Sequence, residues 1–220
     1  MDKVTLLKGS VILVFLLIIA ALIYYIYLMA TGPGTHMPDL PPAGTIFEEP
    51  LQQSCSLPAI NRMINGVNYK ITPVATYNIT ARVARSCQYH DEMAPLVPMD
   101  MVLLWGRLKD ADVDSNIAYS QRDRRYDYRY SGYCPVSGSY IKTHSANTHI
   151  IPENDAVYVA LKGAAQGQQL TMGGFLVDIY WSRGGGPHWW KTSRTRGDSG
   201  MGSCELFYVD CVTAGNSTVT

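Results

Sequence analysis

An uninterrupted apolar run near the N-terminus constrains this chain more than any other feature. Residues 11–30 read VILVFLLIIAALIYYIYLMA and contain no charged residue, no proline and no glycine. A helix of this length rises about 30 Å, which is the thickness of the hydrocarbon core of a bilayer. Soluble helices are rarely apolar on every face over so many turns. The run therefore predicts a transmembrane helix, with the lipid bilayer as a partner.

The charges that flank the run predict its orientation. Lys3 and Lys8 precede it, whereas no lysine or arginine follows it before Arg62. The positive-inside rule then places residues 1–10 in the cytoplasm and the rest of the chain on the other side. A cleaved signal peptide is the alternative, but its apolar region would be shorter, and Leu28 breaks the small-x-small pattern of its cleavage site. We therefore expect an uncleaved signal-anchor.

The composition excludes two classes of protein. The chain has 220 residues, 18 basic and 18 acidic, and its formal net charge is +0. Only 16% of the residues are charged, whereas 47% are hydrophobic. This balance differs from that of a disordered polyelectrolyte or a basic nucleic-acid-binding protein. Nucleic acid is therefore not expected as a partner.

A proline-rich stretch separates the apolar run from the rest of the chain. Six of the 12 prolines lie between residues 31 and 58. Proline fixes φ and lacks an N–H donor, which favours an extended, semi-rigid chain. We expect residues 31–68 to form a spacer, residues 69–212 a folded domain and residues 213–220 a C-terminal tail. The alternative is that the spacer is an ordered coil packed on the domain.

The folded domain has the patterns of a β protein. Alternating or continuous apolar patterns predict strands over residues 77–85, 125–130, 168–181 and 205–210, the third with a kink at Gly173-Gly174. Asn154 or Asp155 can cap a helix over residues 156–162 that ends at Gly163. A second short helix is predicted from Pro98 towards Trp105. The expected fold is mainly β with one or two short helices, a small OB-like or irregular β-barrel or sandwich after an N-terminal transmembrane helix.

Five cysteines follow the apolar run. An oxidising compartment would allow disulfides among Cys87, Cys134, Cys204 and Cys211, and Cys55 in the spacer is the candidate for the odd thiol. Cys204 and Cys211 flank one predicted strand and lie too far apart to pair with each other. The alternative is that all five are reduced, since a buried cysteine packs as a small hydrophobic residue.

Two aromatic patterns are candidate binding surfaces. Arg122, Arg125 and Arg129 interleave with tyrosines, a combination that suits an acidic glycan, although a ladder of buried tyrosines and solvated arginines is the alternative. Trp181 and the pair Trp189 and Trp190 flank a glycine run and predict a hairpin with an exposed aromatic tip. Exposed tryptophan is typical of protein interfaces, although packing against the domain is equally compatible.

Histidines and serines give weaker signals. His144, Asn147 and His149 form a polar cluster that we interpret as a loop network of hydrogen bonds, because zinc-ligand spacing is absent. No metal and no cofactor is expected. Ser199 lies in Gly-Asp-Ser-Gly, the nucleophile tetrapeptide of trypsin-like proteases, but no histidine has the context that those enzymes use. A serine hydrolase is therefore only an alternative function.

Three segments carry a resemblance to a known group. They resemble segments of a group of uncharacterised bacterial proteins that are anchored by a single membrane helix. The three segments are Trp105–Leu108, Ser145–Pro152 and Cys204–Val209. The resemblance covers about residues 70–210 and implies a bacterial inner-membrane protein whose C-terminal domain faces the periplasm. It implies no activity.

These features predict a non-catalytic binding or assembly module that is anchored in the membrane. Its expected partners are other envelope proteins, within an envelope-spanning complex, or further copies of itself. A second hypothesis is a structural subunit whose N-terminal helix lies in the core of a filament or pilus-like assembly.

Overall fold

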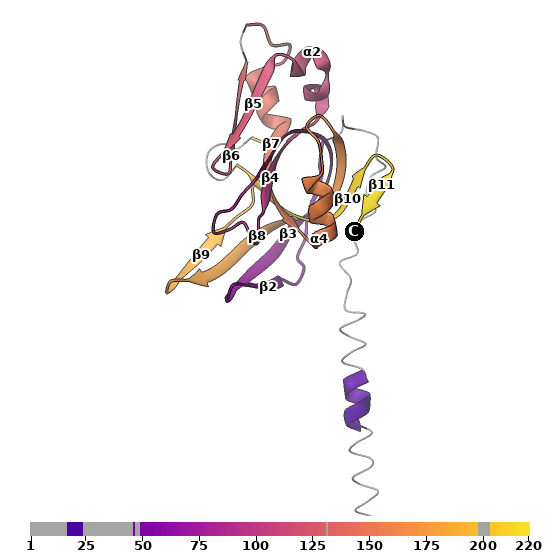
Figure 1. Ribbon diagram of the computed structural model, residues 1–220, viewed down its shortest axis with the longest axis vertical. Helices are drawn as coiled ribbons and strands as arrows, with labels where there is room; N and C mark the ends of the chain where they lie inside the picture. Colours follow the sequence, from indigo (N-terminus) through magenta and orange to yellow (C-terminus); the bar gives the residue numbers. More distant parts are fainter. Residues whose placement is uncertain (1–16, 24–45, 47–48, 131, 198–202) are drawn as a thin grey trace, which may run out of the picture. The chain divides into compact units, whose positions relative to one another are not determined.

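The computed structural model describes residues 17–23, 46, 49–130, 132–197 and 203–220 (Figure 1). The chain divides into two compact units, Met1–His36 and Met37–Thr220. In the first unit, residues 17–23 form an α-helix with exposed apolar side chains. Within the described residues, no helix is both long and apolar enough to span a membrane. Most of the segment 11–30 lies outside those residues, so the anchor stays a prediction.

The second unit is mainly β, as predicted. Its strands are β1 (Leu51–Ser54), β2 (Ile60–Ile64), β3 (Val67–Gln88), β4 (Met99–Leu104), β5 (Ile117–Arg122), β6 (Arg125–Tyr130), β7 (Ser145–Pro152), β8 (Gln169–Arg183), β9 (Gly186–Trp190), β10 (Glu205–Ala214) and β11 (Ser217–Val219). Its helices are a 3-10 turn, η1 (Gly106–Lys109), and α2 (Ala111–Asp114), α3 (Gly138–Thr143) and α4 (Asp155–Lys162). The predicted helix over 156–162 is confirmed, with the Asn154 side chain accepting a hydrogen bond from Val157 N at 3.0 Å.

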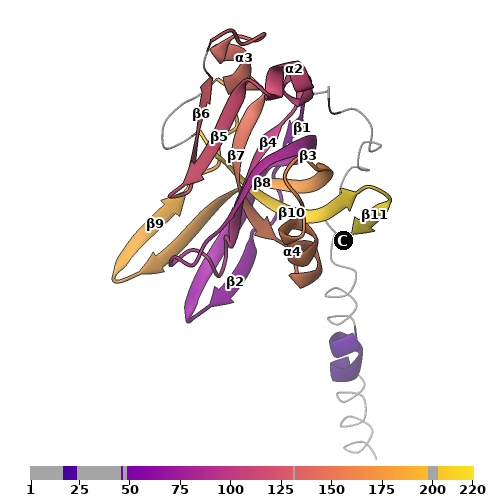
Figure 2. The ribbon, with the colours of Figure 1, turned by 45° about the horizontal axis from the view of Figure 1, so that its top comes forward.

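Nine strands form one large sheet in which β3 is the longest element. The order β1-β3-β4-β7-β10-β8-β9 is supplemented by β2 on β3, β11 on β10 and a further pairing of β3 with β8. The strands pair in the order β3, β4, β7, β10 and β8, and β8 pairs in turn with β3. The succession of pairings therefore returns to β3 (Figure 2). All of these pairs are antiparallel except β7 with β10, which is parallel.

The main hydrophobic core lies on the face of this sheet that α4 covers. Alternate residues of β3, including Tyr77, Ile79 and Val83, point into it. Val157 and Leu161 of α4 pack against the same cluster. The alternation that predicts a strand over residues 77–85 thus marks the buried face.

Two sequence predictions about elements are wrong. Residues 99–104, within the predicted helix from Pro98 towards Trp105, are strand β4, and all six are buried. A short apolar run that is buried on both faces has no periodicity to distinguish a strand from a helix. The predicted C-terminal tail forms the end of β10 and strand β11, which pair as a hairpin.

The predicted spacer 31–68 also differs from the structure in its second half. β1 and β2 both pair with β3, so the sheet begins at Leu51 rather than at residue 69. Prolines at positions 50 and 58 flank β1 instead of interrupting it, which is where a strand tolerates them.

β5 and β6 pair with each other in a separate two-stranded sheet. They are joined by Asp123 and Arg124, whose φ values are 52° and 59°. Positive φ at both central residues is typical of a type I′ hairpin turn, but it costs roughly 1–2 kcal/mol for a residue other than glycine. Ile117 and Tyr119 pack near the base of this arm with Val102, Leu104 and Ile141 of the large sheet and α3.

Gly174 permits the close approach of β8 to β10. Its φ is 151°, and a Cβ atom added there would collide with the carbonyl oxygen of Tyr208. The predicted kink at Gly173-Gly174 corresponds to a register shift in the facing strand, between Val209 and Cys211.

We expect Gly174→Ala to lower the free energy of unfolding by more than about 3 kcal/mol, because backbone strain and overlap add. Urea denaturation followed by circular dichroism measures this change. Gly186→Ala is the matched control, since no atom lies within 4 Å of a Cβ added there, and it should change stability by less than about 0.5 kcal/mol. Equal losses in both variants would contradict the explanation.

Asp210, on β10, is a second point of strain. Burial, and then the nearby Glu153 charge, raise its pKa from 3.8 to about 7. Its Oδ1 atom is buried and accepts no hydrogen bond from the described residues. The pKa of this carboxyl is higher in the folded chain than in the unfolded chain. The free energy of unfolding therefore falls as the pH rises from the unfolded-state pKa to the folded-state pKa.

Asp210→Asn should therefore stabilise the protein at pH 8 by about 1–2 kcal/mol, allowing for partial exposure. The advantage should shrink as the pH falls from 7 to 4, because the native carboxyl is then neutral as well. Urea titrations at several pH values test this, with Asp127→Asn at an exposed position as the control. An advantage that stays constant between pH 4 and pH 8 would rule out the proposed charge effect.

Candidate binding site

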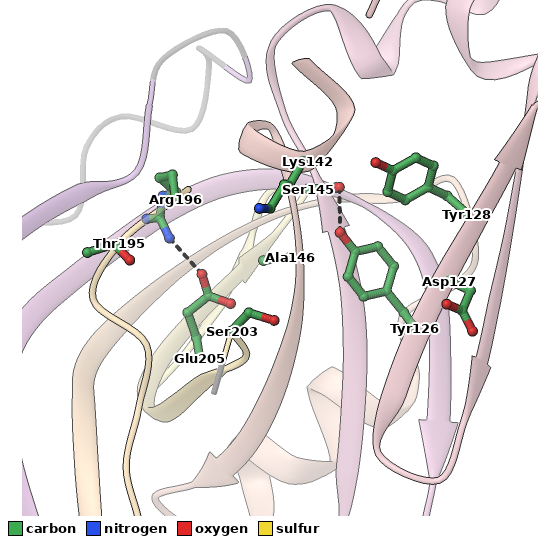
Figure 3. A pocket seen from close by; sticks show the side chains of 10 residues that line it. All are labelled: Tyr126, Asp127, Tyr128, Lys142, Ser145, Ala146, Thr195, Arg196, Ser203 and Glu205. Carbon is green, nitrogen blue, oxygen red and sulfur yellow. Dashed lines mark hydrogen bonds and ion pairs between the residues drawn. The ribbon is translucent and has the colours of Figure 1, made fainter. Parts of the chain in front are cut away.

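A polar pocket of about 440 Å³ lies between the β5–β6 arm and the large sheet (Figure 3). Its lining combines side chains from β6, α3, β7, β10 and the segment after β9: Tyr126, Asp127, Tyr128, Lys142, Ser145, Ala146, Thr195, Arg196, Ser203 and Glu205. In Figure 3 the two tyrosines stand on one side, and Thr195 and Arg196 stand opposite. Segments distant in sequence thus build one cavity.

Arg196 and Glu205 form the most buried charged pair of the pocket. Arg196 Nη1 lies 2.6 Å from Glu205 Oε1, and the Glu205 side chain is only 3% exposed. Arg196 Nη2 donates to the hydroxyl of Tyr77 at 3.1 Å, and the guanidinium lies 5.4 Å from the ring centres of Tyr77 and Trp105. Burial alone would lower the pKa of Arg196, but Tyr77, Glu205 and Glu49 raise it overall. The cation is therefore fixed in place with its charge compensated.

Hydroxyl groups and a lysine complete the lining. The hydroxyls of Tyr126 and Ser145 lie 2.9 Å apart, and Ser145 donates to the carbonyl of Ile141 at 2.6 Å. Burial raises the pKa of Tyr126 to about 12, so this hydroxyl is neutral at physiological pH. Lys142 Nζ donates to the carbonyl of Gly197 at 2.7 Å and keeps further N–H groups. The pocket can therefore both donate and accept hydrogen bonds.

The predicted arginine surface does not line this pocket. Arg122, Arg125 and Arg129 are exposed, whereas Tyr126 and Tyr128 are half-buried. The predicted strand over residues 125–130 is confirmed, and its two faces separate the arginines from the tyrosines. Arg122 contacts Asp123 at 3.0 Å in a fully exposed ion pair. The sequence therefore identified the strand correctly. It placed the binding surface on the arginines, whereas the tyrosines of this strand line the cavity.

The three predicted tryptophans lie on one hairpin, formed by β8 and β9. Trp189 is 64% exposed and packs on Tyr180, with ring centres 4.4 Å apart. Trp181 stacks on His188, and Trp190 packs against His149. The hairpin thus presents one exposed tryptophan, while the other two are half-buried.

The predicted loop network of His144, Asn147 and His149 differs from the structure, because residues 145–152 are strand β7. Alternate side chains of a strand share a face, so Asn147 and His149 lie together and His144 lies apart. His149 Nδ1 is 2.8 Å from Asp100 Oδ1, and Asn147 Nδ2 donates to Asp100 Oδ2 at 3.3 Å. His144 instead contacts Glu49 at 3.1 Å. Among the described residues, no three histidine, cysteine or acidic side chains are arranged to hold a metal ion.

The predicted cysteines are placed by the structure, whereas the predicted serine is not. Cys55, Cys87, Cys134 and Cys211 are free thiols, and the sulfur of Cys204 accepts a hydrogen bond from Asn147 Nδ2 at 3.7 Å. Pairing in an oxidising compartment stays a prediction. Ser199 lies outside the described residues.

Sequence reasoning missed the residues that build the pocket. Lys142, Arg196 and Glu205 belong to segments that are separated along the chain, and no pattern around them predicts that they meet at one pocket. The alternating tyrosines of β6 were a usable signal, although one hairpin could not indicate what it faces.

The chain matches no family model, no curated protein and no solved structure. The resemblance to bacterial membrane-anchored proteins therefore stays a prediction, and function has to be inferred from the geometry of the site.

We expect Arg196→Met to lower the free energy of unfolding by about 3 kcal/mol, because Glu205 would lose its ion pair in a buried position. Arg122→Met, at the exposed pair with Asp123, should change stability by less than about 1 kcal/mol. Urea denaturation of both variants measures the difference. Similar losses would mean that burial does not strengthen the Arg196–Glu205 pair.

Proposed function

We propose that this chain is a non-catalytic binding module whose pocket takes a neutral, hydroxyl-rich ligand, one or two sugar residues of a glycan. The observation that carries the proposal is the pocket lining. It contains two cations, Lys142 and Arg196, and two anions, Asp127 and Glu205, so the charges balance. A balanced set of donors and acceptors suits hydroxyl groups, each of which can both donate and accept.

The tyrosines support the same ligand class. Tyr126 and Tyr128 give the wall flat aromatic surfaces with polar ends, and such rings combine apolar contact with hydrogen bonding. Pockets that bind small molecules typically add a few fixed polar groups to such surfaces. The Arg196–Glu205 pair supplies them, because both side chains are held by neighbours. An acidic glycan on the exposed arginines has less support, since those side chains line no wall of the cavity.

The strand pairings support an OB-like barrel as the framework of this module. Five strands, β3, β4, β7, β10 and β8, lead back to the first, and α4 lies between β7 and β8 in the chain. A small OB barrel is expected to have several strands, then one helix, then a long bent strand and a closing strand. Barrels of this type bind oligosaccharides and oligonucleotides on strands and adjoining loops. This framework is part of the proposal.

The predicted anchor gives the module its place in the cell. The apolar run at residues 11–30 and the basic residues before it support a single-pass protein with the β domain in the periplasm. A glycan partner is compatible with that compartment. Other envelope proteins would then be reached through the exposed Trp189.

Isothermal titration calorimetry with a panel of neutral and uronic-acid oligosaccharides tests the proposed ligand. We expect binding of neutral members, and a loss of about tenfold in affinity in Lys142→Ala or Asp127→Ala, because each removes one charge-assisted hydrogen bond.

Arg125→Ala and Arg129→Ala are the matched controls, since both residues lie on the same strand as Asp127 but neither lines the cavity. They should leave affinity within about twofold of the wild type, because they remove no hydrogen bond inside the cavity. Failure of every oligosaccharide to bind would overturn the proposal. Loss of binding in the two arginine variants alone would instead favour the acidic-glycan surface.

A further inference from the structure

The turn at the tip of the β5–β6 arm places one side chain, Arg124, against β4 and the segment between β3 and β4. Arg124 Nε and Nη2 donate to the two carboxylate oxygens of Asp91, both at 2.7 Å. Nη2 also donates to the carbonyl of Val97 at 2.9 Å, and Nη1 lies 3.4 Å from Asp100 Oδ1. A bidentate pair of this kind fixes the direction of the guanidinium as well as its position.

Aromatic rings and backbone contacts enclose the same guanidinium. Its central carbon lies 4.3 Å from the ring centre of Tyr89 and 5.7 Å from that of Trp190. The backbone N–H of Arg124 donates to the hydroxyl of Tyr89 at 3.0 Å, and its carbonyl accepts from Asn147 Nδ2 at 3.2 Å. These contacts form a guanidinium site made by the large sheet and the segment between β3 and β4.

The rest of the arm is attached unevenly. Ile117 and Tyr119 belong to a buried apolar cluster, and Tyr126 and Tyr128 pack against its edge while half-buried. The contacts of the turn and its neighbour are polar: Arg124 lies in its site, and Gln121 Nε2 donates to Asn147 Oδ1 at 2.7 Å. The arm shares no sheet with β4 and β7, because β5 and β6 pair with each other (Figure 2). The base can therefore act as a hinge while the tip separates from the sheet.

We propose that the β5–β6 arm is a flap over the polar pocket, held closed by Arg124 in this guanidinium site. β6 supplies three residues of the pocket lining, Tyr126, Asp127 and Tyr128, so separation of the tip removes one wall. The turn places arginine where a type I′ hairpin favours glycine, and the contacts of its side chain offset that strain. This inference rests on the proposed function for its purpose, although the flap itself does not depend on the ligand.

Native-state hydrogen exchange of the full chain without ligand tests the flap. In Arg124→Ala, exchange of the paired amides of β5 and β6 should accelerate by about tenfold to a hundredfold, because a two-stranded hairpin that separates from its support is only marginally stable. Amides of β3 and β8 should change by less than about twofold, because the large sheet stays folded. Equal acceleration in both sheets, or none in β5 and β6, would overturn the proposal.

Two further variants keep the test specific. Asp91→Asn changes the exposed end of the site and should accelerate the same amides by a smaller factor. Arg122→Ala, the neighbouring arginine of the same turn, should leave them unchanged, because the ion pair of its side chain is with exposed Asp123 and not with the guanidinium site. Acceleration by Arg122→Ala equal to that by Arg124→Ala would mean that charge near the turn, rather than the inserted side chain, holds the arm.

Chemical rescue distinguishes a specific guanidinium site from a general loss of stability. Guanidinium chloride at about 50 mM, well below denaturing concentrations, should slow exchange in the arm of Arg124→Ala by occupying the vacated site. Sodium chloride at the same ionic strength should not. Equal effects of the two salts would count against a guanidinium site. Failure of oligosaccharides to bind would refute the proposed function while leaving these exchange results intact.

Discussion

The insertion of Arg124 between Asp91 and Asp100 is the interaction on which the candidate site depends. Asp100 is fully buried, and a carboxylate in that position is costly unless cations and hydrogen bonds surround it. Arg124, His149 and Asn147 surround it from two directions. The β5–β6 arm is thereby positioned over β4 and β7, and the pocket exists because the arm is in that place.

The pocket itself is a balanced polar cavity on a rigid base. In its most buried ion pair, Arg196 with Glu205, the guanidinium lies 5.4 Å from the ring centres of Tyr77 and Trp105 and donates to the Tyr77 hydroxyl. The opposite wall belongs to the arm, whose base packs in an apolar cluster and whose tip is held by the polar contacts of Arg124 and Gln121. In the proposed flap, one wall stays fixed while the other moves, an arrangement suited to admitting and retaining a ligand.

The sequence predicted elements whose signals are local. Asn154 and Gly163 mark the ends of α4, and the alternation along β3 and β6 marks their buried faces. It failed at β4, where an apolar run has no period, and at β1, β2 and β11, which are short edge strands stabilised by their neighbours.

The site was harder to predict because it is built from distant segments. Alternation correctly separated arginines from tyrosines on β6, but it could not place Arg124. That residue lies in the turn, where a positive φ redirects its side chain into the sheet. The contact of Arg196 with Glu205 likewise depends on how the segment after β9 returns to β10, which no pattern in the sequence records.

Chemical-shift mapping by nuclear magnetic resonance tests the central claim most directly. On titration with a neutral oligosaccharide, we predict that the amides with the largest shifts will include those of Tyr126, Lys142 and Glu205, on three segments that meet at the pocket. Shifts confined to the exposed face of Arg125 and Arg129, or to Trp189, would contradict the account.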